Sequence, residues 1–510
     1  MTGPNGNAAD YFIDRHLREG RDDRVVFTDP WRRMTYAQLG EASARFAAGL
    51  RALGVQREQR IVLAMLDTVD FPVAFWGALR AGVIPVPINT LLPAETVGYI
   101  LEDSRAAALF VSEPLLDALE GVAGRIGRVV VSAPDGAGGD FAEFLGNAPA
   151  PIADCSADEV AFWLYSSGST GMPKGARHVH ASLKATADTY GAQVLQIEPD
   201  DLMFSVAKLF FAYGLGNSMT FPMAAGAGAV LLPVRPTPDI VLDTMGHFRP
   251  TLFAGVPTLY AAMLADPALG PGAGSDRLRR CISAGEPLPE QVGLRWRDKV
   301  GIDILDGIGS TEMLHIFLSN APDDIRYGTT GKPVPGYEVK IVDAEGNEIG
   351  NEAGELVVRG ASAAEGYWNQ RAKSRRTFRG EWTHTGDTYI RDGDGYYRYC
   401  GRSDDMLKVG GIWVSPFEVE EALIGHPAVL ETAVVGHSDA DGLIKPRAFV
   451  VLQEAARKQD RAALSVELQE HVKQRIGVWK YPRWIEFPDT LPKTATGKIQ
   501  RFKLREAVGC

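Results

Sequence analysis

The sequence predicts an α/β protein with a large N-terminal domain and a small C-terminal domain. The chain has 510 residues, which is too long for one ordinary core. Helical segments alternate with short apolar strands over roughly the first 305 residues, an order typical of largely parallel sheets. From about residue 329, short strands separated by turns indicate a small β-rich subdomain. We therefore expect an N-terminal domain of α/β subdomains over 1–402 and a small α+β domain over 403–510.

The first elements can be assigned from capping residues and apolar runs. Thr35 and Gln38 form a capping box that opens a helix over 35–53, and Gly54 is a natural stop. The following apolar runs predict strands at 60–66, 83–88, 108–111 and 128–131, with a helix at 71–81. Segment 132–151 is rich in Ala, Gly and Pro and predicts a surface loop.

The later elements are shorter. Strands are expected at 337–342 and 354–359, and the run Arg-Asp-Gly-Asp-Gly at 391–395 predicts a hairpin turn. Its carboxylates could suggest calcium, but the twelve-residue spacing of a calcium loop is absent. In the C-terminal region, Ser415-Pro-Phe-Glu418 predicts a capping box with proline at the first helical position, opening a helix that runs to about Gly425. A second helix at 463–476 and strands at 432–435, 447–452 and 483–487 complete that domain.

The composition excludes several classes of protein. The formal net charge of −11 argues against a nucleic-acid partner. Four widely spaced cysteines predict neither a zinc site nor a disulfide framework. The N-terminus lacks a signal pattern, and the most apolar stretch, 219–234, contains two prolines and two glycines. We expect that stretch to be buried core rather than a membrane span, in a cytoplasmic protein with no membrane partner.

Residues 165–175 carry the clearest chemical signal. They read Tyr-Ser-Ser-Gly-Ser-Thr-Gly-Met-Pro-Lys-Gly and follow an apolar strand that starts at Val160. Backbone N–H groups, hydroxyls and one ammonium suit a polyphosphate, although the spacing is not that of a Walker loop. A Gly/Ser-rich surface turn is the alternative. The candidate phosphate-binding residues are Ser166, Ser167, Gly168, Ser169, Thr170, Gly171 and Lys174.

Three further stretches complete a recognisable set. They are Asp306-Gly-Ile-Gly-Ser-Thr-Glu312, Thr383-His-Thr-Gly-Asp387 with Gly401-Arg-Ser-Asp-Asp405, and Pro492-Lys-Thr-Ala-Thr-Gly-Lys498. Each alone is typical of an ordinary turn, cap or solvated tail. Together, in this order, they resemble the acyl-adenylate-forming (AMP-binding) superfamily, which includes acyl-CoA ligases, luciferases and peptide-synthetase adenylation domains. The resemblance covers nearly the whole chain.

The resemblance implies roles around MgATP. Thr311 would contact the α-phosphate and Glu312 would hold Mg²⁺, which prefers one or two carboxylates plus phosphate oxygens. Asp387 and Arg402 would bind the ribose. Lys498 would stabilise the charge that gathers as the adenylate forms. The residues expected against the adenine are Gly285, Glu286, Pro287, Asp306, Gly307 and Ile308.

The resemblance also implies a second arrangement of the C-terminal domain, in which coenzyme A reacts. Asp404 occupies the position where the family pivots. Gly410 and Gly411 would then bring backbone close to the pantetheine, and Lys408 would lie on the face that replaces Lys498. A fixed interdomain turn is the alternative.

Two segments look like benzoate-CoA ligases in particular: 208–217, Lys-Leu-Phe-Phe-Ala-Tyr-Gly-Leu-Gly-Asn, and 310–319, Ser-Thr-Glu-Met-Leu-His-Ile-Phe-Leu-Ser. No carboxylate stands at the presumed pocket positions to hold an α-ammonium, which argues against an amino-acid substrate. Plain core packing is the alternative for the aromatic residues and for the histidine. By resemblance, an acyl pocket formed by 208–217 and 309–316 surrounds an aromatic ring with Ala212, Tyr213, Gly214, Gly309, His315 and Ile316.

The implied reaction joins a benzoate or substituted benzoate to coenzyme A through an aroyl-AMP, with AMP and diphosphate as products. The alternatives are a ligase for another small carboxylic acid and an adenylation enzyme that loads a carrier protein. No carrier domain precedes the end at Cys510, which favours free coenzyme A. A non-catalytic nucleotide sensor is disfavoured because Glu312, Asp387, Arg402 and Lys498 are all retained. The sequence leaves open the ring substituents and the oligomeric state, including a homodimer.

Overall fold

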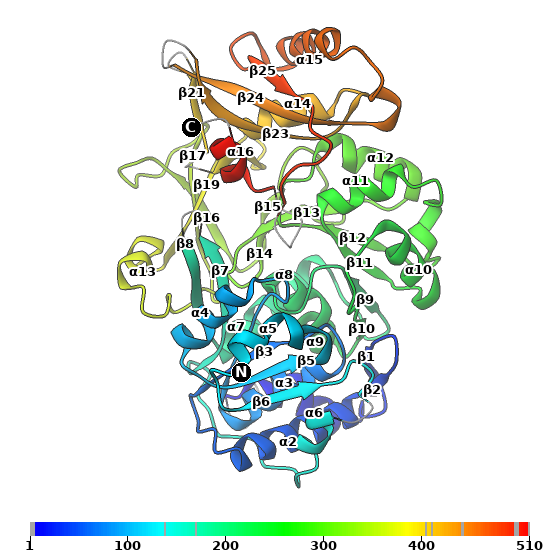
Figure 1. The fold of residues 1–510 in the computed structure, drawn as a ribbon, viewed down its shortest axis with the longest axis vertical. Coiled ribbons are helices and arrows are strands. Elements are labelled where there is room, and N and C mark those ends of the chain that lie inside the picture. The colour runs from blue at the N-terminus through cyan, green and yellow to red at the C-terminus, as the bar shows by residue number, and fades with distance from the viewer. Residues whose placement is uncertain are drawn as a thin grey trace.

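The computed structural model describes residues 6–136, 139–168, 171–402, 405–409, 412–439, 443–493 and 499–507. Figure 1 shows the N-terminal helices and sheets at the bottom and right, the β-rich part at the left, and the C-terminal strands across the top. The predicted α/β class, with a large N-terminal and a small C-terminal part, is confirmed. No helix within the described ranges is long and apolar enough to span a membrane.

The first sheet has four parallel strands in the order β4–β3–β5–β6. Its strands are β3 (Arg60–Ala64), β4 (Ile84–Pro87), β5 (Ala106–Ser112) and β6 (Val129–Ser132). The helices of this region are α2 (Tyr36–Ala52), α3 (Asp70–Ala81), α4 (Ala94–Ser104), α5 (Leu116–Ala123) and α6 (Gly139–Phe144). The predicted capping box is present, because the Thr35 side chain accepts from Gln38 N–H and the Gln38 side chain accepts from Thr35 N–H.

Helix α6 corrects one expectation. The segment 132–151 was expected to be a surface loop, yet it contains this helix, and Phe141 within it is buried. The ring of Phe141 lies 5.8 Å from that of Phe46 on α2. Burying an aromatic side chain stabilises the short helix, which the Ala, Gly and Pro content of the surrounding residues concealed.

The second sheet has nine strands in the order β15–β14–β13–β12–β11–β9–β10–β1–β2. The strands from β13 to β1 run parallel, and β14, β15 and β2 are antiparallel to their neighbours. The strands are β1 (Val25–Thr28), β2 (Arg33–Thr35), β9 (Leu202–Ser205), β10 (Gly228–Val230), β11 (Leu252–Gly255), β12 (Arg280–Ser283), β13 (Ile304–Gly309), β14 (Ile316–Ser319) and β15 (Lys332–Pro333). This mixed sheet carries the edge at which the candidate site is built.

Helices pack on both faces of this sheet and around its ends (Figure 1). They are α1 (Arg15–Arg18), α7 (His180–Thr186), α8 (Ala212–Leu215), α9 (Phe221–Ala225), α10 (Pro238–Phe248), α11 (Pro257–Ala265) and α12 (Glu290–Val300). Wider π-helical turns occur at Asp10–Asp14, Ala187–Val194 and Gly216–Thr220, and 3₁₀ turns at Glu113–Leu115, Pro271–Gly274 and Glu454–Ala456. The apolar stretch 219–234 is largely buried in this region, as expected.

The β-rich part contains a five-stranded sheet and a separate hairpin. The sheet is built from β16 (Glu338–Val342), β17 (Gly354–Arg359), β18 (Phe378–Arg379), β19 (Trp382–Arg391) and β20 (Tyr397–Arg402), with α13 (Arg371–Thr377) beside it. The hairpin pairs β7 (Val160–Gly168) with β8 (Gly171–Val179). The predicted turn at 391–395 joins β19 to β20, and its Asp392 accepts from backbone N–H groups and from Arg326.

The C-terminal region has its own apolar core, which includes Leu407, Val419, Val434, Leu464 and Leu468. Its elements are β21 (Leu407–Val409), β22 (Ile412–Val414), α14 (Pro416–Ile424), β23 (Val429–Ser438), β24 (Ile444–Leu452), α15 (Arg461–Ile476), β25 (Trp484–Glu486) and α16 (Arg501–Ala507). Ser415 caps α14 by accepting from Glu418 N–H, but the Glu418 carboxylate pairs with Lys480, so the Ser415 half of the predicted capping box is what the structure confirms. The domain boundary at 402/403 stays a prediction.

Candidate active site

Two parallel strands bring the candidate adenine-binding segments together. Ser283 at the end of β12 lies opposite Asp306 in β13. Residues Gly285, Glu286 and Pro287 follow β12, and Gly307 and Ile308 continue β13. Since parallel strands end at the same edge of a sheet, both segments lie at one edge, which is the usual place for a nucleotide in open α/β sheets.

Asp306 is the most unusual carboxylate at this edge. Its side chain is buried, and its Oδ1 atom makes no protein hydrogen bond. Burial raises the pKa of Asp306 well above its ordinary value, while backbone N–H groups of Leu288 and Gly307 oppose that shift. A buried polar atom without a partner is costly, so Oδ1 is suited to accept from a bound ligand.

The segment 165–175 differs from the loop that we expected. Most of it belongs to the β7–β8 hairpin, in which Ser166 lies opposite Lys174 and Gly168 opposite Gly171. The strand pairing continues further into the Gly/Ser-rich run than its composition suggested, because antiparallel strands need only a tight turn between them. Ser169 and Thr170 lie outside the described residues, and no side-chain placement is described for Ser167.

A compact charged cluster connects this hairpin to Glu312. The Lys174 ammonium lies 3.3 Å from Glu312 Oε1, and the Ser166 hydroxyl lies 3.5 Å from the same oxygen. Tyr367 donates its O–H to Glu312 Oε1 at 2.7 Å and accepts from Lys174 at 2.6 Å. The Lys174 ammonium also lies 3.9 Å from the centre of the Tyr367 ring.

The cluster keeps Glu312 ionised. Burial acts to raise the pKa of this carboxyl, but the charge of Lys174 and the hydrogen bond from Tyr367 together hold the pKa below its ordinary value. An ionised carboxylate beside a lysine ammonium fits a magnesium ion that takes its remaining ligands from phosphate oxygens and water.

Thr311 is fixed through its backbone. The buried His178 on β8 donates from Nε2 to the Thr311 carbonyl oxygen at 2.8 Å. Burial lowers the pKa of His178 to about 4, so the ring is neutral at pH 7. The 178–311 hydrogen bond therefore ties the hairpin to the segment that carries Thr311 and Glu312.

The candidate ribose-binding pair is set by strand register. Asp387 on β19 lies directly opposite Arg402 on β20. The Arg402 guanidinium donates to Asp387 Oδ1 at 3.1 Å and also to the Thr385 carbonyl oxygen. The structure thus brings together two residues that the sequence separates by 15 positions.

The end of the C-terminal segment reaches the adenine-side loop. The backbone N–H of Ile499 donates to Glu286 Oε1 at 3.3 Å, a contact between residues 213 positions apart. Lys493 and Ile499 also form an isolated antiparallel bridge. Lys498, Asp404, Gly410 and Gly411 lie outside the described residues. Lys408 belongs to β21, where it pairs with Trp413, and its side-chain placement is not described.

The first wall of the candidate acyl pocket begins at α8, which starts at Ala212. Gly214 lies so close to the preceding turn that a Cβ atom there would stand 2.0 Å from the Lys208 carbonyl oxygen. Only glycine fits this position. The Tyr213 hydroxyl lies 3.2 Å from the Gly255 carbonyl oxygen and 3.3 Å from that of Ile282. The wall is therefore held by hydrogen bonds to the ends of β11 and β12.

The second wall is the turn between β13 and β14. Gly309 pairs with Ile316, and a Cβ atom at 309 would lie 2.5 Å from the His315 carbonyl oxygen. His315 Nε2 donates to the Tyr213 carbonyl oxygen at 3.3 Å, which joins the two walls. The His315 ring packs among Tyr190, Tyr213 and Phe221, with ring centres 4.5 to 5.7 Å away. Burial lowers the pKa of His315 to about 3, so the pocket wall is uncharged.

Sequence reasoning missed Tyr367 and His178. Each contributes a contact to a motif residue from a segment that carries no motif of its own. Residues 365–368 pair with β8, through Trp368 N–H to the Gly175 carbonyl and Arg177 N–H to the Gly366 carbonyl. The two adjacent aromatic residues of this segment, Tyr367 and Trp368, were the available signal.

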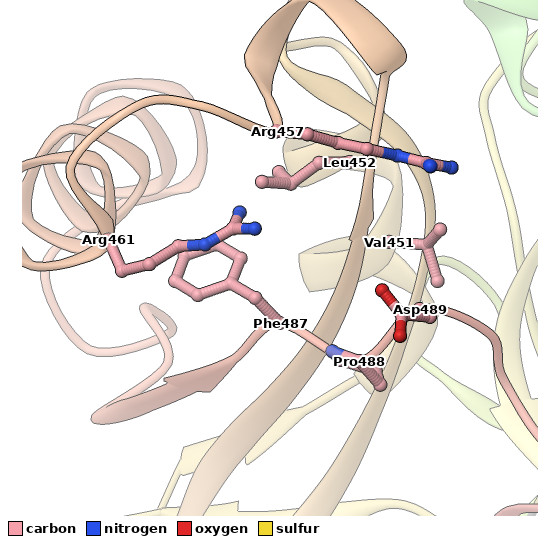
Figure 2. A pocket seen from close by; sticks show the side chains of 7 residues that line it. All are labelled: Val451, Leu452, Arg457, Arg461, Phe487, Pro488 and Asp489. Carbon is pink, nitrogen blue, oxygen red and sulfur yellow. The ribbon is translucent and has the colours of Figure 1, made fainter.

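A small hollow in the C-terminal domain is distinct from this site. Figure 2 shows that it is lined by residues of β24, of the segment before α15, of the start of α15 and of the chain after β25, namely Val451, Leu452, Arg457, Arg461, Phe487, Pro488 and Asp489. Its cavity volume is about 10 Å³, which is no more than one water molecule needs. It cannot hold a nucleotide or an acyl group.

The comparisons with known proteins agree with this geometry. The AMP-binding enzyme family matches residues 13–368, and the AMP-binding enzyme C-terminal domain matches residues 418–498. The chain belongs to the AMP-binding enzyme family, which confirms the predicted superfamily.

Within this family, the chain is similar to benzoate–CoA ligases. The 4-hydroxybenzoate–CoA/benzoate–CoA ligase of Rhodopseudomonas palustris is 53% identical, over 98% of this chain and 94% of that protein. The benzoate–CoA ligase of Thauera aromatica is 52% identical, over 98% of this chain and 96% of that protein. A benzoate CoA ligase from Burkholderia xenovorans LB400 has a similar solved structure, with a TM-score of 0.91, 49% identity and coverage of 98% and 99%.

Proposed function

We propose that this protein is an AMP-forming aryl-CoA ligase that converts a benzoate-type acid, ATP and coenzyme A into aroyl-CoA, AMP and diphosphate. In the first half-reaction a carboxylate oxygen attacks the α-phosphorus of ATP, and the bond to diphosphate breaks. In the second, the coenzyme A sulfur attacks the acyl carbon, the thiol loses its proton, and AMP leaves. The relatives of 52 and 53% identity support this reaction.

One observation carries the proposal. The segment 309–316 contributes Glu312 to a charged cluster and His315 and Ile316 to an uncharged aromatic wall. The charged cluster suits the phosphates of ATP, and the aromatic wall suits a flat ring. An acid whose ring lies against the wall would therefore present its carboxylate toward the phosphates.

The nucleotide is bound by groups from three parts of the fold. Lys174 and the hairpin N–H groups would hold the phosphates, Asp387 and Arg402 the ribose, and the β12 and β13 ends the adenine. Mg²⁺, held by Glu312, would neutralise phosphate charge when bound. Tyr367 keeps the Glu312 carboxylate oriented, and His178 fixes the carbonyl of Thr311.

The C-terminal domain would complete the site for adenylation. The Ile499–Glu286 contact supports an arrangement in which the adjacent Lys498 faces the nucleotide. Its ammonium would stabilise charge on the α-phosphate and the acyl carboxylate. Rotation about Asp404 would then expose the aroyl-AMP to coenzyme A, with Gly410 and Gly411 close to the pantetheine and Lys408 on the face that replaces Lys498. The proposal places the enzyme in the cytoplasm, where ATP and coenzyme A are available.

A panel of acids tests the proposal. The purified protein is incubated with ATP, MgCl₂, coenzyme A and one acid at a time, and AMP and acyl-CoA are quantified. Benzoate or a singly substituted benzoate should give the highest kcat/KM, above acetate, hexanoate and palmitate. A higher kcat/KM for an aliphatic acid than for every benzoate would reject the aromatic assignment. Formation of AMP with a carrier protein but not with coenzyme A would reject the acceptor.

A further inference from the structure

Two ionisable side chains beside the acyl wall have no part in the chemistry described above. Asp67 follows β3 in the first sheet, and its side chain is buried. Lys208 begins the wall segment and is partly buried. Burial raises the pKa of Asp67 to about 6 and lowers that of Lys208, and each charge opposes the shift of the other. Placing charges here costs stability, so a compensating role is expected.

Asp67 holds the wall from one side. Its two carboxylate oxygens lie 3.3 and 3.2 Å from the backbone nitrogen of Leu209 and accept its N–H. The two residues are 142 positions apart. This hydrogen bond connects the turn before α3 to the wall segment.

Lys208 holds the wall from the other side. Its ammonium donates to the carbonyl oxygens of Leu232 and Val234, the latter at 2.7 Å, just beyond β10. Both carbonyl groups belong to residues that follow β10, which ends at Val230. The two peptide units at 208 and 209 are thus fixed between the first sheet and the second.

The fixed peptides touch the pocket wall directly. The Lys208 carbonyl oxygen accepts from Phe211 N–H at 3.0 Å, and Phe211 in turn accepts from Leu215 N–H at 2.7 Å. The same Lys208 carbonyl would lie 2.0 Å from a Cβ atom at Gly214. Any shift of residue 208 is therefore transmitted to Gly214 and to the neighbouring Tyr213.

We propose that Asp67 and Lys208 are positioning residues of the acyl pocket, which fix the wall segment 208–214 from both sides and so set the space for the aromatic ring. Neither side chain touches the reacting atoms. The inference rests on the proposed function only in that segment 208–214 faces the acid.

The test separates acid binding from nucleotide binding. Lys208→Met and Asp67→Ala should each raise KM for the best acid of the panel about tenfold, the size expected for a lost hydrogen bond in a buried setting. The KM for ATP and kcat should stay within about twofold of wild type. The conservative variants Lys208→Arg and Asp67→Asn keep a donor and an acceptor, and they should restore most of the acid affinity.

Asp70 offers a matched control. It is buried, stands three residues beyond Asp67, and accepts from Arg32 and Ser132 rather than from the wall. Asp70→Ala should lower Tm without changing KM for the acid. If Lys208→Met and Asp67→Ala are folded and leave the acid KM unchanged, or raise the KM values for acid and ATP equally, the inference is wrong.

The conservative pair keeps the test decisive where a truncation does not fold. If Lys208→Arg and Asp67→Asn raise the KM for the acid by the about tenfold expected for the truncations while keeping the wild-type Tm, that result would also overturn the inference. Each variant's KM is compared with the wild-type KM for the acid that the wild type prefers. A failure of this inference can therefore be told apart from a failure of the aromatic assignment.

Discussion

The nucleotide side and the acyl side of the candidate site are built on opposite principles. On the nucleotide side, charged groups contact each other directly, as Lys174, Tyr367 and Glu312 do. On the acyl side, the Tyr213 hydroxyl and the His315 Nε2 atom are directed to backbone carbonyl oxygens, and the buried His315 ring is uncharged. The comparison predicts that charge chemistry depends on side chains, whereas acid selectivity depends on where the backbone is held.

The largest effect should come from the nucleotide side. Lys498→Ala should reduce adenylate formation by ~10²–10³, because a single electrostatic group is removed from the charged transition state. Formation of thioester from supplied aroyl-AMP should be nearly unchanged. Both half-reactions can be measured separately, by diphosphate release and by aroyl-CoA formation.

Lys493→Ala is the matched control for this prediction. Lys493 is the first lysine of the same motif, but it pairs with Glu431 at 2.6 Å. It should retain adenylation within about threefold, since exposed ion pairs contribute little. Equal loss of both half-reactions in a folded Lys498→Ala protein would contradict the assigned role.

The proposed hinge at Asp404 would separate the two half-reactions in time. Asp404→Pro, which fixes φ at this position, should slow aroyl-CoA formation by a factor on the order of 10² and leave diphosphate release within about threefold. Pre-steady-state measurement of both products gives the two rates. Asp404→Ala removes the side chain without restraining φ and should be much less affected. Equal slowing of both steps would make this segment a linker.

A larger side chain at Ala212 tests the acyl side. Ala212→Phe should raise KM for the aromatic acid about thirtyfold while KM for ATP changes by less than about twofold, because overpacking affects the ring alone. Ala212→Gly removes volume and should keep the acid KM within about threefold. Unchanged acid KM in a folded Ala212→Phe variant would remove Ala212 from the pocket.

The smallest effect should come from Tyr367. Tyr367→Phe deletes the hydroxyl that contacts both Lys174 and Glu312 and should raise the Kd for MgATP about tenfold, the size expected when a hydrogen bond to a charged group is lost. Calorimetric titration with MgATP measures this directly. Tyr397→Phe is the control, because its hydroxyl donates to the Val339 carbonyl within the β-rich sheet. An unchanged Kd would contradict this prediction and show that MgATP binding does not depend on the Tyr367 hydroxyl.

Much of this organisation could be predicted from the sequence, for definable reasons. Capping residues located α2 and α14 correctly, and apolar runs located the parallel strands of the first sheet. The pairing of Asp387 with Arg402 was also implied, because both belong to one motif set. The helices and strands depend on short-range patterns, which the sequence contains directly, whereas the Asp387–Arg402 pair was implied by the family resemblance.

The remaining features depend on contacts between distant segments. Helix α6 is stabilised by Phe141 against Phe46, and Tyr367 acquires its partners only because 364–368 pairs with β8. Asp67 is likewise 142 positions from the peptide that it holds. No local pattern encodes such pairings, so they become visible only in the folded chain.

The central claim is that one segment joins a general nucleotide site to a wall that selects aromatic acids. Acid-dependent exchange between labelled diphosphate and ATP, measured without coenzyme A, tests it most directly, since only adenylate formation contributes. With benzoate or a monosubstituted benzoate, exchange should be rapid and reach saturation, and with acetate or hexanoate at the same concentration it should be at least about tenfold slower. Equal or faster exchange with an aliphatic acid would contradict the account.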